Sequence, residues 1–168
     1  MKNITLFFCL FFLNFLYSQK GERFAINGIL VNFPQEVEYK STLKNSGQFH
    51  FVDKDETNIL ASVRDSKNME FYNENFNEIE MLEAFYKWDF DYWKDNSMNA
   101  KVSEIEKNLE KKYILWKIEL KEGNSIFLFG IKDFKVISIS TNNNNHLKDE
   151  QQIQLLKGIY KKINLYKE

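Results

Sequence analysis

The chain is 168 residues long and nearly neutral, with 23 basic and 24 acidic residues and a formal net charge of −1. That balance excludes the strongly basic character of most nucleic-acid-binding proteins, so no nucleic acid is predicted as a partner. A single cysteine excludes a disulfide within the chain and a zinc site built from cysteines. Aromatic residues make up 16% of the chain, but an AT-rich genome also favours phenylalanine, so this richness alone indicates no function.

Residues 1–18 have the three parts of a secretory signal peptide. Lys2 supplies the positive charge, Ile4–Leu13 is almost wholly apolar, and a small residue stands at position 18, after which we place the cut. The apolar run is shorter than the roughly 20 residues that a membrane-spanning helix needs. Large residues precede Cys9, which argues against a lipoprotein signal and against lipid attachment.

These features predict an exported protein, periplasmic or extracellular, with no stable membrane anchor after processing. The mature chain would comprise residues 19–168, a length that suits one domain and hardly two. A domain of this size buries about two-thirds of the surface of its unfolded chain. Its hydrophobic core can therefore stabilise it without disulfides.

The first half of the mature chain is predicted to form strands. Arg23–Phe33 is rich in β-branched and aromatic residues and is closed by the only proline, Pro34, which predicts one edge strand followed by a turn. Gln48–Val52 and Asn58–Arg64 flank the polar segment Asp53–Thr57. This arrangement predicts a β-hairpin with a loop of about five residues.

Residues 76–95 change from the two-residue period of a strand to the period of a helix. Charged residues gather on one side of this helix, and Glu83 and Lys87 have the favoured order of acid before base at a spacing of four. Apolar residues occupy an arc of roughly 200°, much wider than the stripe of about 100° on an ordinary surface helix. We call residues 76–95 the aromatic helix.

The second half returns to strands and ends in a helix. Tyr113–Leu120 alternates, so that its isoleucines, its tryptophan and its last leucine share one face. Residues 125–131 and 134–140 follow after short turns, which predicts an antiparallel meander. Residues 100–108 fit either a helix or a fourth strand, and the strand is favoured. Leu147–Leu165 is predicted to be an amphipathic helix, with acidic residues near its start and lysines near its end.

This order predicts an α+β fold in which an antiparallel β-sheet packs with two main helices in a single layered domain. It resembles the PsbP-like, Mog1-like and DcrB-like fold group in its opening strand ending at Asn32-Phe33-Pro34, the strand at 58–63, the meander at 113–140 and the last helix. The resemblance implies a central antiparallel sheet with a closing helix. It also implies an exported, non-catalytic accessory protein, since the group includes such proteins and has no shared catalytic residues. The long aromatic helix departs from that pattern.

The sequence contains no motif of a known catalytic mechanism. His50 and His146 lack the close ligand pair that is typical of zinc sites. Neither a G-x-S-x-G elbow nor a glycine-rich phosphate loop occurs. Asp53–Thr57 is not followed by the glycine and the glutamate that a calcium loop needs. We therefore predict a non-catalytic protein with no metal and no cofactor.

Asp89 is the unusual carboxylate of the chain, because it falls inside the apolar arc, between Phe85, Tyr86, Tyr92 and Trp93. Burial raises the pKa of a carboxyl group among aromatic residues, and such groups often mark functional sites. In the structural alternative, Asp89 meets an arginine or a backbone donor, as buried charges usually do. The alternative function is a secreted or periplasmic hydrolase that uses carboxylates.

The aromatic helix is the predicted binding surface, and its candidate binding residues are Phe85, Trp88, Asp89, Tyr92 and Trp93. Packing against a sheet would cover about half of its apolar arc. The rest is covered by another element of the chain or by a protein partner or second copy, or it lines a cleft for an apolar or carbohydrate ligand. All three interpretations stay open, and the predicted function is that of an exported, non-catalytic binding or accessory protein.

Overall fold

The computed structural model describes residues 21–96, 100–121, 123–142 and 147–166. The predicted signal peptide at residues 1–18 lies outside the described residues, as do Cys9 and His146. Within the described ranges, no helix is both long enough and apolar enough to cross a membrane.

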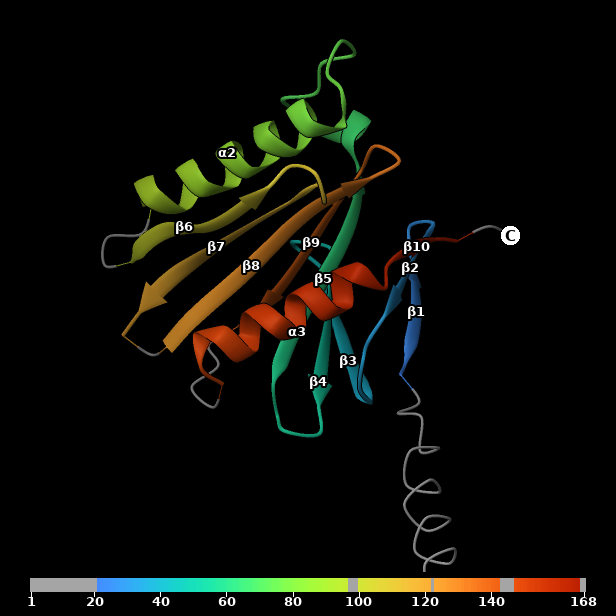
Figure 1. Cartoon of the computed structure of the whole chain (residues 1–168), viewed down its shortest axis with the longest axis vertical. Helices are drawn as coiled ribbons and strands as arrows, with labels where there is room; N and C mark the ends of the chain where they lie inside the picture. Colours follow the sequence, from blue (N-terminus) through green and yellow to red (C-terminus); the bar gives the residue numbers. More distant parts are fainter. Residues whose placement is uncertain (1–20, 97–99, 122, 143–146, 167–168) are drawn as a thin grey trace, which may run out of the picture.

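A seven-stranded sheet forms the centre of the fold, and each pair of neighbouring strands in it is antiparallel (Figure 1). In order across the sheet, the strands are β3 (Val37–Leu43), β4 (Gln48–Asp53), β5 (Asn58–Asp65), β9 (Lys135–Thr141), β8 (Gly123–Lys132), β7 (Tyr113–Leu120) and β6 (Lys101–Asn108). The structure confirms the predicted hairpin as β4 and β5, and the meander as β7, β8 and β9. The ambiguous segment is the strand β6, as favoured.

A second sheet holds three strands, β1 (Arg23–Ile26), β2 (Ile29–Asn32) and β10 (Asn164–Leu165). The prediction of one continuous strand over 23–33 is wrong, because Asn27 and Gly28 form a two-residue turn with φ of 46° and 76°. Positive φ at both positions is the type I′ geometry, for which Asn-Gly is the strongest sequence signal. The last helix also ends before Leu165, which belongs to β10.

The edge strand β3 corresponds to no predicted element. Six of its seven residues are exposed, so the alternation of buried and exposed positions that identifies a strand is missing. Its pairing with β4 shifts register at Lys40, between Tyr39 and Ser41. A bulge and the charges of Glu38 and Lys40 are means by which natural edge strands avoid pairing with other chains.

The two predicted helices are present as α2 (Glu78–Asn96) and α3 (Asp149–Lys161). α2 begins with a capping box in which Asn77 Oδ1 accepts hydrogen bonds from the N–H groups of Ile79 and Glu80, at 2.8 and 3.1 Å. The Glu80 carboxylate in turn accepts from the Asn77 N–H at 2.8 Å. A short 3₁₀ helix, η1 (Ser66–Asn68), follows β5.

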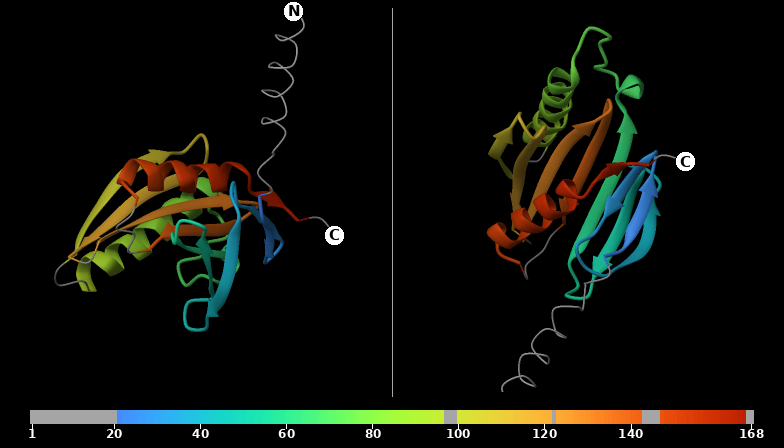
Figure 2. Two further views of the ribbon diagram at one scale, coloured as in Figure 1. Left: turned by 90° about the horizontal axis from the view of Figure 1, so that it is seen from below. Right: turned by 45° about the vertical axis from the view of Figure 1, so that its right-hand side comes forward.

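The helices cover opposite faces of the seven-stranded sheet, and the small sheet shares the face of α3 (Figure 2). Strand β7 serves both layers. Its Trp116 belongs to the apolar cluster under α2, whereas Leu115 belongs to the cluster under α3. Trp116 pairs in register with Phe127 of β8, and their stacked ring centroids are 4.4 Å apart. The architecture is α+β with antiparallel sheets and two main helices, as predicted.

Candidate functional site

A pocket of about 1420 Å³ lies at one end of the seven-stranded sheet. The β6–β7 turn, the β8–β9 turn, the first turn of α2 and the end of α3 form its walls. We call it the turn-end pocket, and it is lined by Asn77, Glu78, Ile79, Leu109, Glu110, Lys111, Lys112, Tyr113, Ile131, Lys132, Asp133, Phe134, Lys157, Tyr160, Lys161 and Ile163.

The β8–β9 turn holds Phe134 in an unusual conformation at the rim of the pocket. Asp133 and Phe134 have φ of 51° and 53°, the type I′ geometry of a two-residue turn. A left-handed φ costs a residue with a Cβ about 1–2 kcal/mol. Two contacts hold Phe134 there: its N–H donates to Glu78 at 3.1 Å, and its carbonyl accepts from the Ser66 N–H at 3.0 Å. The Phe134 side chain is thereby kept 42% exposed.

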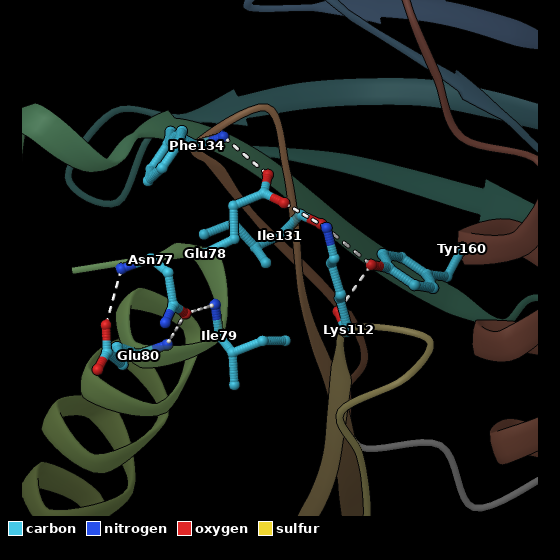
Figure 3. Close-up of polar contacts among 8 residues, drawn as sticks. All are labelled: Asn77, Glu78, Ile79, Glu80, Lys112, Ile131, Phe134 and Tyr160. Carbon is cyan, nitrogen blue, oxygen red and sulfur yellow. Dashed lines mark hydrogen bonds and ion pairs between the residues drawn. The ribbon is translucent and has the colours of Figure 1, made fainter.

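The β6–β7 turn holds a second left-handed residue, Lys112, with φ of 54°. The carbonyl of Lys112 accepts hydrogen bonds from the Ile131 N–H at 3.3 Å and from the Tyr160 hydroxyl at 2.7 Å (Figure 3). Since Tyr160 belongs to α3, this hydroxyl fixes the helix to the turn. Burial raises the pKa of Tyr160 to about 12, so the hydroxyl stays protonated and remains a donor at neutral pH.

Glu78, in the first turn of α2, joins the helix to both strand-connecting turns. Its carboxylate accepts from the Lys112 ammonium and from the Phe134 N–H (Figure 3). Burial acts to raise the pKa of Glu78, but the hydrogen bond and charge of Lys112, together with backbone N–H groups of the β8–β9 turn, outweigh burial, and its pKa lies below the ordinary value of 4.5. The carboxylate is therefore charged at neutral pH, near the positive end of the α2 dipole.

Replacing Glu78 with glutamine should lower the free energy of unfolding at pH 7 by about 1 kcal/mol, because the partly exposed pair with Lys112 loses its charge. Since folding lowers the pKa of Glu78, its contribution is complete above pH 4.5 and is lost as the pH falls through the lower folded value. Urea unfolding at several pH values should show the difference shrinking below pH 4.5. Glu83→Gln is the control, because the Glu83 side chain is 41% exposed against 19% for Glu78, and it should lose less stability. An equal loss in the two variants, or a loss in Glu78→Gln that does not change with pH, would contradict the expectation.

Five lysines line the turn-end pocket, against three carboxylates. Three of these lysines are engaged. Lys112 pairs with the helix carboxylate described above, and Lys157 Nζ is 2.5 Å from the Glu106 carboxylate. Lys132 Nζ donates to the Ile163 carbonyl at 2.6 Å. Their ammonium groups mainly hold the walls of the pocket together.

The other two lysines, Lys111 and Lys161, are exposed and take part in none of the ion pairs found in the described chain. Apolar side chains stand in the same lining. Leu109 is 39% exposed at the rim, whereas Ile131 and Ile163 are buried. The lining of the pocket therefore combines available cations, exposed apolar groups and buried apolar groups.

The five candidate residues of the aromatic helix occupy different environments. Phe85 is 4% exposed, with its ring centroid 4.5 Å from that of Phe129 in the sheet, and Trp93 is half-buried. Trp88 and Tyr92 are 39% and 56% exposed. The described lining of the turn-end pocket includes none of the five candidates.

The segment between η1 and α2 covers part of the wide apolar arc. The Phe71 ring centroid lies 5.8 Å from that of Trp88, and the Glu70 carboxylate accepts a hydrogen bond from Trp88 Nε1. Met81 is buried. Another element of the same chain thus accounts for much of the apolar surface that the helix does not turn to the sheet, and Tyr92 stays exposed.

Asp89, the fifth candidate, is half-buried in α2. Burial raises its pKa to about 6, and the Arg64 guanidinium, the smaller influence, lowers it. The charge acting on Asp89 is thus a cation from β5, whereas glycosidase-type chemistry needs a second carboxylate. In the part of the chain that the structure describes, no three His, Cys, Asp or Glu side chains gather to hold a metal ion.

Sequence reasoning did not find the turn-end pocket, because its lining comes from four segments that lie far apart in the chain. One local signal was available. A turn at Lys132-Asp133 was predicted, with Phe134 as the first residue of the next strand. The structure shifts this turn by one residue, because Lys132 pairs with Lys135 and the two-residue loop is Asp133-Phe134, with positive φ at both positions. A bulky residue at a position that usually takes Gly, Asn or Asp would have identified the rim of a candidate site.

The antiparallel sheet covered by a helix on each face has the PsbP-like fold, as the order of elements predicted. Among solved structures, the chain is similar to the solution structure of cyanobacterial PsbP (CyanoP) from Synechocystis sp. PCC 6803, with a TM-score of 0.57 and 10% sequence identity. The similarity covers 87% of this chain and 92% of that chain, and at this identity it shows the fold alone. No family model matches the sequence. No curated protein sequence matches it either.

Proposed function

We propose that this protein is an exported, non-catalytic binding or accessory protein, and that the turn-end pocket is its binding site. Export is inferred from the signal peptide predicted at residues 1–18, whose removal leaves residues 19–168. The fold supports an accessory role, since the fold group that the sequence resembles includes exported accessory proteins. The pocket supplies the contact surface that such a role requires.

The conformation of Phe134 is the observation that carries this proposal. Strained residues persist only where their surroundings hold them, and they gather at functional sites. Glu78 and Ser66 fix the Phe134 backbone from both sides. Glycine or asparagine would make the same turn at lower energy. An exposed phenylalanine in this position is therefore explained by a contact that its ring makes with a bound molecule.

The polar groups of the pocket suit binding better than catalysis. General acids and bases work best with a pKa near the operating pH. The pKa of Glu78 is lowered, and its charge is neutralised by Lys112. The pKa of Tyr160 is raised to about 12, and its hydroxyl is already engaged with a carbonyl. Both groups hold the walls in place and neither is poised to exchange protons near pH 7.

Replacing Phe134 with asparagine should remove binding and leave the fold stable. Asparagine adopts the left-handed conformation readily, so the turn keeps its geometry and the free energy of unfolding changes by less than about 1 kcal/mol. Native mass spectrometry of the mature protein, purified from its own cell envelope, should show extra mass from a bound molecule or partner on the wild type. Phe134→Asn should raise the dissociation constant roughly tenfold, which corresponds to about 1.4 kcal/mol of lost binding, and the occupied fraction should fall accordingly.

Tyr166→Asn provides the matched control, because it also removes an exposed aromatic ring, but outside the pocket lining. This variant should keep the bound mass. A bare monomer in every preparation would contradict the proposed function. Equal extra mass on the wild type and on Phe134→Asn would contradict the assignment of binding to this pocket.

The exposed part of the aromatic helix is a second candidate site, for a protein partner, a second copy of the chain, or an apolar or carbohydrate ligand. Trp88 and Tyr92 support it, because tryptophan and tyrosine are enriched in interfaces and remain exposed here. The same experiment separates the two sites. Bound mass that is lost in Trp88→Ala or Tyr92→Ala, and kept in Phe134→Asn, would assign binding to the helix.

A further inference from the structure

We infer that the turn-end pocket binds an anionic amphiphile, that is, a carboxylate or phosphate group carried by an apolar chain. The inference rests on the proposed function, since it names the ligand class of the same site. Cations and exposed apolar side chains lie together in the pocket lining, and each matches one half of such a molecule.

The anionic half follows from the charges. The whole chain has a formal net charge of −1, yet lysines outnumber carboxylates five to three in the pocket lining. Glu78 pairs with Lys112, and Lys157 pairs with Glu106 outside the lining, so three lysines and two carboxylates of the lining are left outside these ion pairs. Lys111 and Lys161 are exposed and can contact a ligand without first leaving a partner. A cleft lined by an excess of one charge raises the local concentration of ligands of the opposite charge.

The apolar half follows from the apolar side chains of the lining. Leu109 and Phe134 are 39% and 42% exposed at the rim, whereas Ile131 and Ile163 are 1% exposed. The Tyr160 hydroxyl already donates a hydrogen bond to the Lys112 carbonyl, so an apolar ligand would not leave this donor without a partner. An apolar chain would remove both rim side chains from water, which is the main source of affinity in most ligand pockets.

The size of the pocket favours an amphiphile over a small inorganic anion. Ligand pockets usually have volumes of about 300–1,000 Å³, and this one has about 1420 Å³. A free phosphate would fill a small part of it and leave Leu109 and Phe134 in water. A nucleic acid would require a longer basic track than one pocket on a nearly neutral protein provides.

Four probes that each contain a straight chain of ten carbon atoms test the inference: decanoate, decyl phosphate, decanol and decyltrimethylammonium. Each is titrated, below its micelle concentration, into isotope-labelled mature protein observed by two-dimensional NMR. Decanoate and decyl phosphate should shift the amide signals of the β6–β7 and β8–β9 turns. They should bind roughly tenfold more tightly than decanol, with the cation weakest, and salt should reduce this advantage.

The double variant Lys111→Gln with Lys161→Gln should weaken decanoate binding roughly tenfold and leave decanol binding unchanged. The matched control is Lys54→Gln with Lys94→Gln. Both control lysines are exposed and lie outside the pocket lining, in the β4–β5 turn and in the last turn of α2. The control pair should bind all four probes as the wild type does.

Vesicles distinguish the two sources of such a ligand. Binding to phosphatidylglycerol vesicles but not to phosphatidylcholine vesicles, lost in the Lys111/Lys161 double variant, identifies an anionic lipid headgroup in a membrane. Binding of decanoate without vesicle binding identifies a soluble amphiphile. Both results support the inferred chemistry.

Other outcomes overturn the inference and can be told apart from failure of the proposed function. If decanol binds as tightly as decanoate, the pocket is a binding site whose ligand is not anionic. If an acidic peptide shifts the turn signals and no amphiphile does, the site takes a protein segment instead. If no probe shifts these signals and native mass spectrometry finds a bare monomer, the inference and the proposed function both fail.

Discussion

Replacing Gly130 with alanine should lower the free energy of unfolding by about 3 kcal/mol. A Cβ at this position in β8 would lie 2.6 Å from Cζ and 2.8 Å from the hydroxyl oxygen of Tyr160, too close for non-bonded atoms. The Tyr160 ring would have to move, and its 2.7 Å hydrogen bond to the Lys112 carbonyl would break. Overpacking and an unpaired polar group each cost about 1–3 kcal/mol. The same displacement would distort one wall of the turn-end pocket.

Gly158→Ala in α3 is the matched control for this substitution. Beyond the adjoining residues and backbone of α3 itself, no atom lies within 4 Å of the Cβ that it adds, and alanine is favoured over glycine inside a helix by about 1 kcal/mol. Urea unfolding should therefore show Gly158→Ala at least as stable as the wild type. If the clash is the cause, combining Gly130→Ala with Tyr160→Ala should cost less than the sum of the two changes. An additive double variant, or a fully stable Gly130→Ala protein, would contradict the explanation.

The elements that sequence patterns predicted well are those whose side chains are buried on a regular period. In β7, Ile114, Trp116 and Ile118 face α2, as their alternation indicated, because that face is covered by a helix. The aromatic helix was identified by its change of period and begins at Glu78, after a capping residue. Such patterns exist because each buried side chain has to meet the core.

The mispredicted elements are those whose structure is determined by main-chain pairing, turn conformation or contacts between distant segments, and not by a periodic pattern of buried side chains. β3 is held by main-chain pairing at an exposed edge, so its side chains carry no periodic signal. The β1–β2 turn was overlooked because its flanking residues are all strand formers, although Asn27-Gly28 marks the reversal. The wide apolar arc of α2 indicated that the helix has more apolar surface than the sheet can cover. The sequence could not show that Phe71 and Glu70 pack against Trp88.

The turn-end pocket was beyond sequence reasoning for a related reason. Its lining depends on which turns meet at one end of the sheet, and that follows from strand order. Glu78 looked like an ordinary acidic residue in the first turn of a helix, a position that the helix dipole favours. Only the fold places it between Lys112 and Phe134. Asp89, by contrast, was recognised because its unusual position is visible on one helix.

Replacing Asp89 with asparagine should raise the free energy of unfolding at pH 7 by about 2 kcal/mol. Burial raises the pKa of Asp89 from its ordinary value of 3.8 to about 6, against the smaller opposing effect of Arg64. The folded protein thus binds this proton more tightly than the unfolded chain does. The charged carboxylate costs stability fully above pH 6, and the cost declines as the pH falls and vanishes below about 3.8. Asparagine removes the charge and keeps the size.

The pH dependence separates this explanation from a general gain in packing. Urea unfolding should show the advantage of Asp89→Asn at pH 7 shrinking below pH 6 and vanishing below about pH 3.8, where Asp89 is protonated in both the folded and the unfolded state. Asp95→Asn, an exposed change on the same helix, should have little effect at either pH. A destabilised Asp89→Asn protein would mean that the carboxylate makes a necessary contact. A hydrolytic activity that is present in the wild type and lost in a stable, folded Asp89→Asn protein would instead support the alternative of a hydrolase. Carboxylates that lower the stability of a fold are often retained because catalysis needs them.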